Sequence, residues 1–299
     1  MRCKGLTHAD KGSIERGLRA RQRHLSAYSF AQFAVWQGIY RVEWMRCEGA
    51  LCVFFKDALG SFMNCEPLGQ DITPAAVTAA FAAMDRCNPN KAYSRIENVE
   101  ENRIGFYRAL GYEAVAKGGE YVYERARLAR LAGDPYKSKR AGVNYFTKTY
   151  AADYAPYLPR HRQACLDLYD RWAEQRAATS SDRIYIGMLK DSRSCLDVAL
   201  RRPSALGLVG RIVAVSGVIR AFTIGYGLNA DTFCIMYETA DLSFKGISQY
   251  IFRRFCQEME QYRFINAMDD SGLARLQAVK RSYRPAAVIP AYIVQRPHA

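Results

Sequence analysis

Strand-like and helix-like segments alternate along almost the whole chain, and this alternation restricts the possible folds more than any other feature. Apolar runs at 51–55 and 61–64 predict strands. The alanine-rich run 74–84 begins with a proline, which suits the first turn of a helix, and predicts a helix. Further helices are predicted at 102–110, 139–150, 161–178, 182–201, 244–262 and 272–282. Further strands are predicted at 120–123, 206–216, 218–227, 231–238, 263–266 and 286–294. Interleaved strands and helices favour an α/β (α+β) fold with mixed central sheets.

Turn-forming residues divide this pattern near its middle. Gly133, Asp134 and Pro135 interrupt the periodic segments, and 299 residues are enough for two domains of about 150 residues each. The N-terminal stretch is basic and lacks a broad apolar face, so it is either an arm that contacts phosphate or a solvated helix end. We predict a basic N-terminal segment at 1–23, a first domain at 24–135 and a second domain at 136–299.

The formal net charge of +14 is the strongest signal in the composition. Such an excess attracts polyanions, so nucleic acid, an anionic membrane surface or a phosphate-rich cofactor all fit, as does a purely solubilising surface. No segment reaches the roughly 18 apolar residues that a transmembrane helix needs, and the N-terminus has no apolar run typical of a secretory signal. We therefore expect a cytoplasmic protein.

The nine cysteines are scattered and form no Cys-x-x-Cys pair. An odd number in a chain of this length does not suggest a disulfide framework. No histidine stands at a spacing typical of zinc sites. We predict free thiols and no metal.

Four motifs in the C-terminal half occur in a distinctive order. They are Ala221-Phe222-x-x-Gly225, Tyr237-Glu238-x-Ala240-Asp241 followed by Lys245-Gly246, Asn266-x-x-x-Asp270-x-Gly272, and Leu276-x-x-x-Lys280-x-Ser282-Tyr283-x-Pro285. This series resembles the phosphatidylglycerol lysyltransferase C-terminal domain family, and the resemblance extends from about Ala27 to the C-terminus.

The chain departs from the family pattern at several charged positions. Gln277 stands where the family has Arg, Met268 where it has Glu, Met236 and Thr239 where it has His and Lys, and Ala141 and Gly142 where it has Asn and His. Since these departures mostly remove polar groups, they bear on the substrate more than on the fold.

The segment 102–113 resembles a helix and glycine turn of N-acetyltransferase (GNAT) domains. Together with the family resemblance, this implies two tandem GNAT-like acyltransferase domains. The glycine-rich loop that holds the pyrophosphate of acetyl-CoA at a helix N-terminus in GNAT enzymes has no counterpart here. Binding of acetyl-CoA is therefore not indicated.

The best-understood members of the family move an amino acid from a charged tRNA onto an acceptor. The resemblance thus implies an aminoacyltransferase that uses aminoacyl-tRNA as donor and needs no other cofactor. The implied acceptor is a small molecule, a peptide or a lipid reached by peripheral membrane contact. Two alternatives remain open: an acyl-CoA-dependent N-acyltransferase, and a catalytically silent member that binds RNA or other anions.

Transfer from an aminoacyl ester needs a deprotonated acceptor, a stabilised oxyanion and a neutralised tRNA end. Asp270 can orient the α-ammonium group or remove a proton, and Glu238 can hold an ammonium group. Lys280 can face phosphate or the oxyanion, and Tyr283 can donate a hydrogen bond. The candidates for binding substrate or tRNA are Lys137, Lys139, Arg140, Asn144, Lys245, Arg281 and Arg284.

Several of these candidates also have an ordinary structural explanation. Asp270 precedes a predicted helix and is a good helix-start carboxylate. Lys280, Arg281 and Arg284 suit a solvated helix end, and Tyr283 suits a packing position.

Overall fold

The structure is a computed structural model that describes residues 3–297. The chain forms two compact units. Unit 1 contains the chain up to Glu120, together with 269–272 and the residues from Val288 on. Unit 2 contains 121–268 and 273–287.

Unit 1 has a mixed sheet in the order β1-β2-β3-β4-β5-β12. Only β4 and β5 run parallel; the other neighbours whose pairing is resolved run antiparallel. Its strands are β1 (Lys4–Gly5), β2 (Arg41–Cys47), β3 (Ala50–Lys56), β4 (Ser61–Met63), β5 (Arg95–Glu100) and β12 (Ala287–Gln295). Its α-helices are α1 (Lys11–Arg19), α2 (Phe30–Val35), α3 (Pro74–Cys87) and α4 (Ile104–Ala109).

The α3 helix begins as its sequence predicts. The Thr73 hydroxyl accepts a hydrogen bond from the Ala76 backbone N–H, and Pro74 occupies the first turn, where its missing N–H costs nothing. The buried face of α3 packs Phe81 and Met84 against strand residues such as Phe54. This apolar layer is the core of unit 1.

A buried charge cluster lies in the same unit. The Glu66 side chain is fully buried and forms ion pairs with Arg23, at 2.7 Å, and with Arg103, at 3.0 Å. The Tyr28 hydroxyl donates a third hydrogen bond to this carboxylate. Arg23 closes the predicted N-terminal segment 1–23, so that segment ends inside the packed structure of unit 1.

In unit 2 the sheet strands follow the order β6-β11-β10-β9-β8-β7. Here β10 and β11 run parallel, and the other neighbours run antiparallel. Its strands are the end of β6 (Glu113–Glu124), β7 (Ala152–Pro156), β8 (Val209–Val215), β9 (Val218–Gly227), β10 (Thr232–Ala240) and β11 (Phe264–Asn266). Its α-helices are α5 (Arg125–Arg130), α6 (Lys137–Thr149), α7 (Arg162–Ala177), α8 (Arg183–Arg201), α9 (Pro203–Leu206), α10 (Ile247–Glu258) and α11 (Ala274–Arg281).

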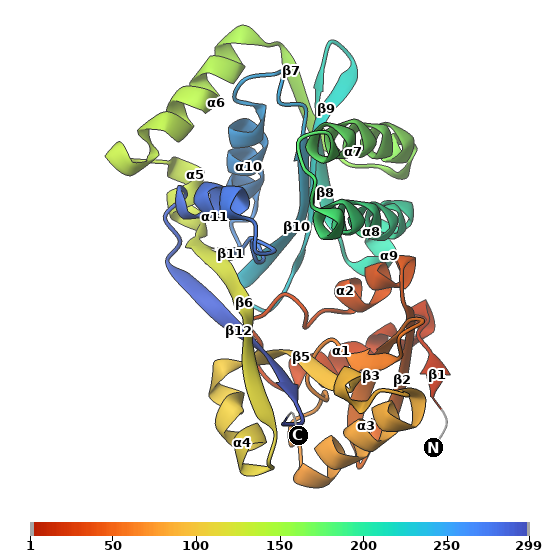
Figure 1. The fold of residues 1–299 in the computed structure, drawn as a ribbon. Coiled ribbons are helices and arrows are strands. Elements are labelled where there is room, and N and C mark those ends of the chain that lie inside the picture. Colours follow the sequence, from red (N-terminus) through yellow and green to blue (C-terminus); the bar gives the residue numbers. More distant parts are fainter. Residues whose placement is uncertain (1–2, 298–299) are drawn as a thin grey trace. The chain divides into compact units, whose positions relative to one another are not determined.

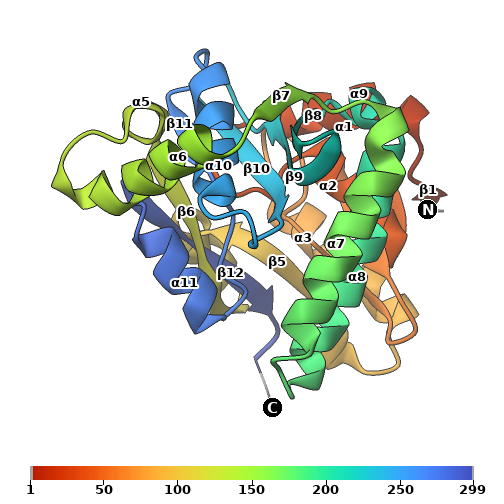
Figure 2. The same cartoon turned by 90° about the horizontal axis from the view of Figure 1, so that it is seen from above.

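Helices cover both faces of this sheet. Figures 1 and 2 show α7 and α8 on one face of the unit 2 strands and α10 on the other. The α10 helix buries Ile251, Phe252 and Phe255 against the sheet, and α5 and α6 pack against α10 in turn. No helix within residues 3–297 is long and apolar enough to span a bilayer.

The predicted α/β (α+β) class with mixed sheets is confirmed, while the units differ in extent from the predicted ranges. The predicted domains are 24–135 and 136–299, whereas the first change of unit falls between Glu120 and Tyr121. The residues from Val288 on belong to unit 1 because β12 pairs with β5. Strands β2, β5 and β7 were not predicted, since their polar side chains interrupt the apolar pattern.

Candidate active site

A β-bulge in β10 decides where Glu238 points. Ile235 lies opposite Gly225 on β9, but Tyr237 lies opposite the adjacent residue Ile224, so Met236 is an extra residue in β10. The bulge reverses the alternation of side chains, because one inserted residue moves each later side chain to the other face. Glu238 therefore shares the face of Ile235, which packs against α10.

The other face receives Tyr237 instead. Its hydroxyl donates a hydrogen bond to the Ser192 carbonyl on α8, at 3.4 Å. Without the bulge, Tyr237 would occupy the α10 side and Glu238 would face α8. Bulges often re-aim a side chain next to a functional site.

Among the described residues, two facing side chains of β9 and β10 lack hydrogen-bond partners on the α10 face. Within residues 3–297, Glu238 Oε2 is buried and has no hydrogen-bond partner, and the same holds for the hydroxyl of Thr223. Thr223 lies directly opposite Glu238 in the strand pair. Buried polar groups are nearly always hydrogen-bonded. Two adjacent groups without partners therefore suggest that a ligand or a water molecule makes the missing hydrogen bonds.

The environment of Glu238 favours the protonated form of its carboxyl group. Burial raises the pKa of the carboxyl to about 8. Its charged form in turn raises the pKa of the Cys256 thiol on α10 and of the Tyr283 hydroxyl, although burial is the larger cause for both. Glu238, Cys256 and Tyr283 are thus electrostatic neighbours.

The parallel strands β10 and β11 separate just before Glu238. Their pairing ends at Cys234 and Asn266, and β10 continues to Ala240 without β11 beside it. After Asn266 the chain instead follows β6, where the N–H of Tyr121 donates to the Met268 carbonyl. Glu238 therefore lies on a stretch of β10 that has lost its parallel neighbour.

Tyr283 is buried at the end of α11. Its ring lies edge-on to Phe252 of α10, and Lys139 Nζ sits 4.2 Å from the ring centroid. Burial lowers the pKa of Lys139. The Tyr136 hydroxyl donates to the Tyr283 carbonyl at 3.1 Å, which links the start of α6 to the end of α11.

Lys280 bonds to the main chain. Its ammonium group donates to the carbonyl of Ala267 at 2.7 Å and to that of Met268 at 3.3 Å. The Lys280 carbonyl accepts a hydrogen bond from the Tyr123 hydroxyl. As placed, Lys280 fixes the loop that follows β11.

Arg140 also has an internal role. Its guanidinium donates to the carbonyls of Leu131 and Gly133, which closes the connection between α5 and α6. The remaining predicted binding residues have exposed side chains: Lys137, Asn144, Lys245, Arg281 and Arg284.

Asp270 belongs to unit 1, whereas the other candidates belong to unit 2. Its carboxylate accepts a hydrogen bond from the Gly272 N–H within the same short loop. The residue at the N-cap of α11 is Leu273, whose side chain provides no cap. Asp270 therefore does not serve as the N-cap of this helix.

Thr223, Cys256 and the bulge at Met236 were not among the site features predicted from the sequence. The strand pattern around Thr223 and the helix pattern around Cys256 are those of ordinary core, so no local signal marked them. Within residues 3–297, no group of three or more His, Cys, Asp or Glu side chains is arranged to hold a metal ion.

Comparison with known proteins identifies the family. The sequence profile described as "Phosphatidylglycerol lysyltransferase, C-terminal" matches residues 18–295. The chain belongs to this family. The family predicted from the C-terminal motifs is thus confirmed.

Solved structures share the fold. A protein of unknown function from Bacteroides thetaiotaomicron is 27% identical, with a TM-score of 0.87 over 99% of both chains. The structure of L-PGS from Bacillus licheniformis is 17% identical, with a TM-score of 0.66 over 97% of this chain and 93% of that one. A tandem GNAT protein from the clavulanic acid biosynthesis pathway is 10% identical, with a TM-score of 0.55 over 100% and 99%. The predicted tandem GNAT-like fold is confirmed.

A curated relative is more distant. An uncharacterized protein from Mycoplasmoides gallisepticum is 22% identical over 180 residues, which cover 58% of this chain. The match spans 55% of that relative, so this chain matches about half of its length.

Proposed function

We propose that this protein transfers an amino acid from aminoacyl-tRNA to an amine or hydroxyl group of a small-molecule, peptide or lipid acceptor. Membership in the phosphatidylglycerol lysyltransferase C-terminal family supports a transferase. The observation that carries the proposal is Glu238, which a β-bulge turns toward α10, where its buried Oε2 has no partner within residues 3–297.

In this proposal the acceptor nitrogen or oxygen attacks the ester carbonyl carbon of the aminoacyl group. The ionised form of the Glu238 carboxyl group takes the proton that the acceptor loses. The ester bond to the terminal ribose then breaks, and the same proton passes to the departing ribose oxygen. A carboxyl whose pKa is about 8 suits both steps, because its two protonation states are accessible near neutral pH.

Tyr283 serves as the hydrogen-bond donor in the same proposal. Burial raises the pKa of its hydroxyl, so the hydroxyl keeps its proton and can donate a hydrogen bond to the tetrahedral oxyanion. The aminoacyl-tRNA donor is already an activated ester, so the proposed reaction needs neither a metal nor another cofactor. In this proposal the reaction takes place in the cytoplasm, where the tRNA is.

A transfer assay tests this directly. Total tRNA charged separately with each labelled amino acid is mixed with the protein and either a lipid extract or a low-molecular-weight extract. We expect label from one or a few amino acids to move from tRNA into one extract. Glu238→Gln is expected to lower the rate by at least ~100-fold, because general acid–base groups typically contribute that much or more.

Two variants make the result specific. Thr223→Val removes the buried hydroxyl that lies opposite Glu238, with little change of shape. Glu260→Gln changes an exposed glutamate of unit 2 and serves as the control. The Glu260 variant should keep full activity. Transfer that survives in Glu238→Gln, or label taken only from acetyl-CoA, would refute the proposed role.

A further inference from the structure

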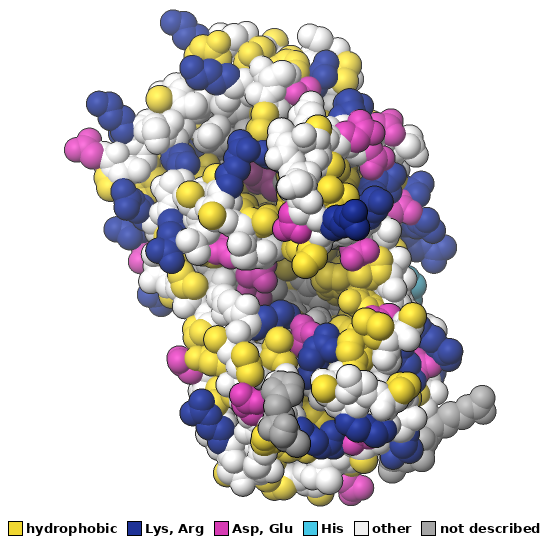
Figure 3. Space-filling model, viewed as in Figure 1, with side chains coloured by type: hydrophobic (Ala, Val, Ile, Leu, Met, Phe, Trp, Pro, Cys, Tyr) yellow, Lys and Arg dark blue, Asp and Glu magenta, His cyan; other side chains and the backbone are white. Residues whose placement is uncertain are grey.

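The helix α11 is barely buried in the structure. Of its eight residues, Ala274 to Arg281, six are exposed, and Leu276 and Lys280 are half-buried. Val279 is 49% exposed. Hydrophobic and basic side chains lie on the surface where α11 is found (Figures 1 and 3). By contrast, α10 has five buried residues. A helix with so little buried surface gains little stability from apolar packing along its length.

Hydrogen bonds from other elements fix the C-terminal end of α11. The Tyr123 hydroxyl on β6 donates to the Lys280 carbonyl at 2.9 Å, and the Tyr136 hydroxyl donates to the Tyr283 carbonyl at 3.1 Å. The Lys280 ammonium group donates to the Ala267 carbonyl at 2.7 Å. Because isolated helices shorter than about 12–15 residues are marginal in water, α11 depends on contacts of this kind.

The backbone on both sides of α11 adopts the left-handed conformation. Ser271 has a φ of +51° and Gly272 a φ of +71° just before the helix, and Arg284 has a φ of +55° just after it. Arg284 also precedes Pro285, and a residue before proline favours extended backbone. Left-handed residues other than glycine are strained. Hinges are a few residues at the ends of elements that absorb large changes of φ and ψ, and both ends of α11 suit this role.

Tyr283 is the buried residue at the end of α11. It belongs to one core cluster with Ile235, Phe252 and Cys256. Glu238 shares the face of Ile235, and its Oε2 is buried and has no partner within residues 3–297. An acceptor cannot reach an oxygen that is closed to solvent, so part of this cover has to move during the proposed reaction.

The elements around this cluster differ in how firmly they are packed. The strands β6, β10 and β11 and the helices α5 and α10 all contribute buried residues of their own. The helix α11 contributes none. Regions with few buried apolar contacts are the first to open locally. The part of the cover that opens most easily is therefore α11 with Tyr283.

We propose that α11 is a lid that opens to admit substrate to Glu238, and that Tyr123 and Tyr136 are positioning residues that hold the lid closed. When the lid opens, their two hydroxyl-to-carbonyl bonds break and Tyr283 leaves the core cluster. When the lid closes, Tyr283 returns to the place from which its hydroxyl donates to the oxyanion. The catalytic role of the lid rests on the proposed function, but the movement itself requires no tRNA.

The thiol of Cys256 reports on this movement. It is buried on α10, in the same cluster as Tyr283. Departure of Tyr283 opens this cluster to a reagent dissolved in water. Cys195 on α8 is also buried, but α8 lies on the other face of the sheet from α10. Cys195 therefore becomes reactive through a different opening, such as the unfolding of unit 2 as a whole.

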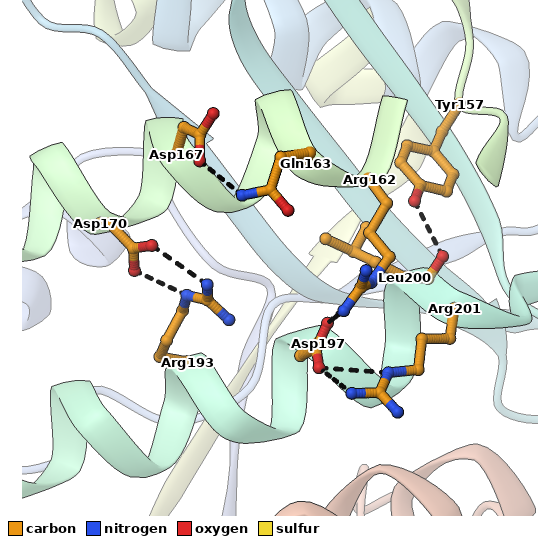
Figure 4. Close-up of polar contacts among 9 residues, drawn as sticks. All are labelled: Tyr157, Arg162, Gln163, Asp167, Asp170, Arg193, Asp197, Leu200 and Arg201. Atoms are coloured by element: carbon orange, nitrogen blue, oxygen red, sulfur yellow. Dashed lines mark hydrogen bonds and ion pairs between the residues drawn. The ribbon is translucent and has the colours of Figure 1, made fainter. Parts of the chain in front are cut away.

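The experiment measures the rates at which N-ethylmaleimide labels Cys256 and Cys195 in the full chain, with the labelled peptides resolved by mass spectrometry. Tyr136→Phe removes one of the two hydroxyls that hold the lid, and the double variant with Tyr123→Phe removes both. Tyr157→Phe is the matched control, because its buried hydroxyl donates to the Leu200 carbonyl at 2.8 Å beside α8 (Figure 4). Far-UV circular dichroism checks that each variant is folded.

We expect Tyr136→Phe to label Cys256 roughly 2- to 10-fold faster than the parent, the usual effect of losing one neutral hydrogen bond. The double variant should label Cys256 faster still, since opening breaks both bonds. The rate for Cys195 should not change in either variant, and Tyr157→Phe should leave the rate for Cys256 as in the parent. Equal acceleration of both cysteines, or no acceleration of Cys256, would overturn the inference.

The transfer assay separates the lid from the proposed function. Tyr136→Phe should lower kcat with little change in KM, because Tyr283 acts as a donor in the transition state. Tyr157→Phe should keep both values. If Cys256 opens through α11 but the parent transfers no amino acid, the lid stands and the proposed function fails. If amino acid is transferred but Tyr136→Phe changes neither kcat nor the labelling of Cys256, the proposed function stands and the lid fails.

Discussion

At the scale of single residues, Glu238 links stability to pH. Burial raises its pKa from 4.5 to about 8, so the folded state holds this proton more tightly than the unfolded chain does. As pH rises above about 4.5 the unfolded chain loses the proton first. The free energy of unfolding therefore falls between pH about 4.5 and about 8, by at most about 1.4 kcal/mol per pH unit, and levels off above.

Glu238→Gln removes this dependence, so we expect the variant to gain stability relative to the parent as pH rises. The measurement is the urea midpoint of both proteins at pH 5.5 and pH 8.5. Glu260→Gln, with its exposed side chain, is the control and should follow the parent at both values. If the urea midpoints of the parent and of Glu238→Gln changed by the same amount between the two pH values, the Glu238 carboxyl would not hold its proton in the folded state.

At the scale of elements, two helices approach one another through glycines. Gly246, just before α10, has a φ of +90°, and a Cβ there would lie 2.1 Å from the carbonyl oxygen of Gly142 on α6. The same spacing brings Tyr250 against Phe146, with ring centroids 4.8 Å apart. The glycine at 142, where the family has His, is thus compatible with a close α6–α10 contact.

Gly246→Ala is expected to lower the free energy of unfolding by roughly 2–4 kcal/mol, from the strain of a positive φ and from the clash with backbone. Gly187→Ala on α8 is the matched control, since a Cβ there meets nothing within 4 Å. That control should be neutral or stabilise by up to about 1 kcal/mol, as alanine favours helices over glycine. Thermal or urea unfolding of both variants measures the difference, and similar effects would show that the α6–α10 contact has room for a side chain.

At the scale of the whole molecule, neither unit is made from one continuous piece of chain. Unit 1 takes its last strand from the C-terminal end, where Tyr292 pairs with Val99 and Val294 with Ile96. Val294 is fully buried in the unit 1 core. The folding of unit 1 therefore depends on residues that are distant in sequence.

Removing the chain from Val288 on is expected to unfold much of unit 1, because it takes away a paired strand and part of the core. Hydrogen exchange followed by mass spectrometry would show faster exchange in peptides from β5 and α3. Arg296→Ala, which loses the ion pair with Asp85 and the contact with the Phe81 ring but no strand pairing, should keep the exchange pattern of the parent. Protected β5 peptides in the truncated protein would contradict this dependence.

The sequence by itself determined what depends on neighbours along the chain. The start of α3 at Thr73 and Pro74 follows from local capping, and the apolar periodicity gave the helices α7 and α8. The ordered C-terminal motifs gave the family, and with it the tandem GNAT-like fold.

Only the tertiary structure decided which charged groups are available to a ligand. Lys280 and Arg281 look alike in the sequence, yet one bonds to the Ala267 carbonyl and the other is exposed. Glu238 faces α10 only because Met236 is inserted in the pairing of β10 with β9. Register, bulges and carbonyl partners depend on segments far away in the chain, so no local pattern of residues encodes them.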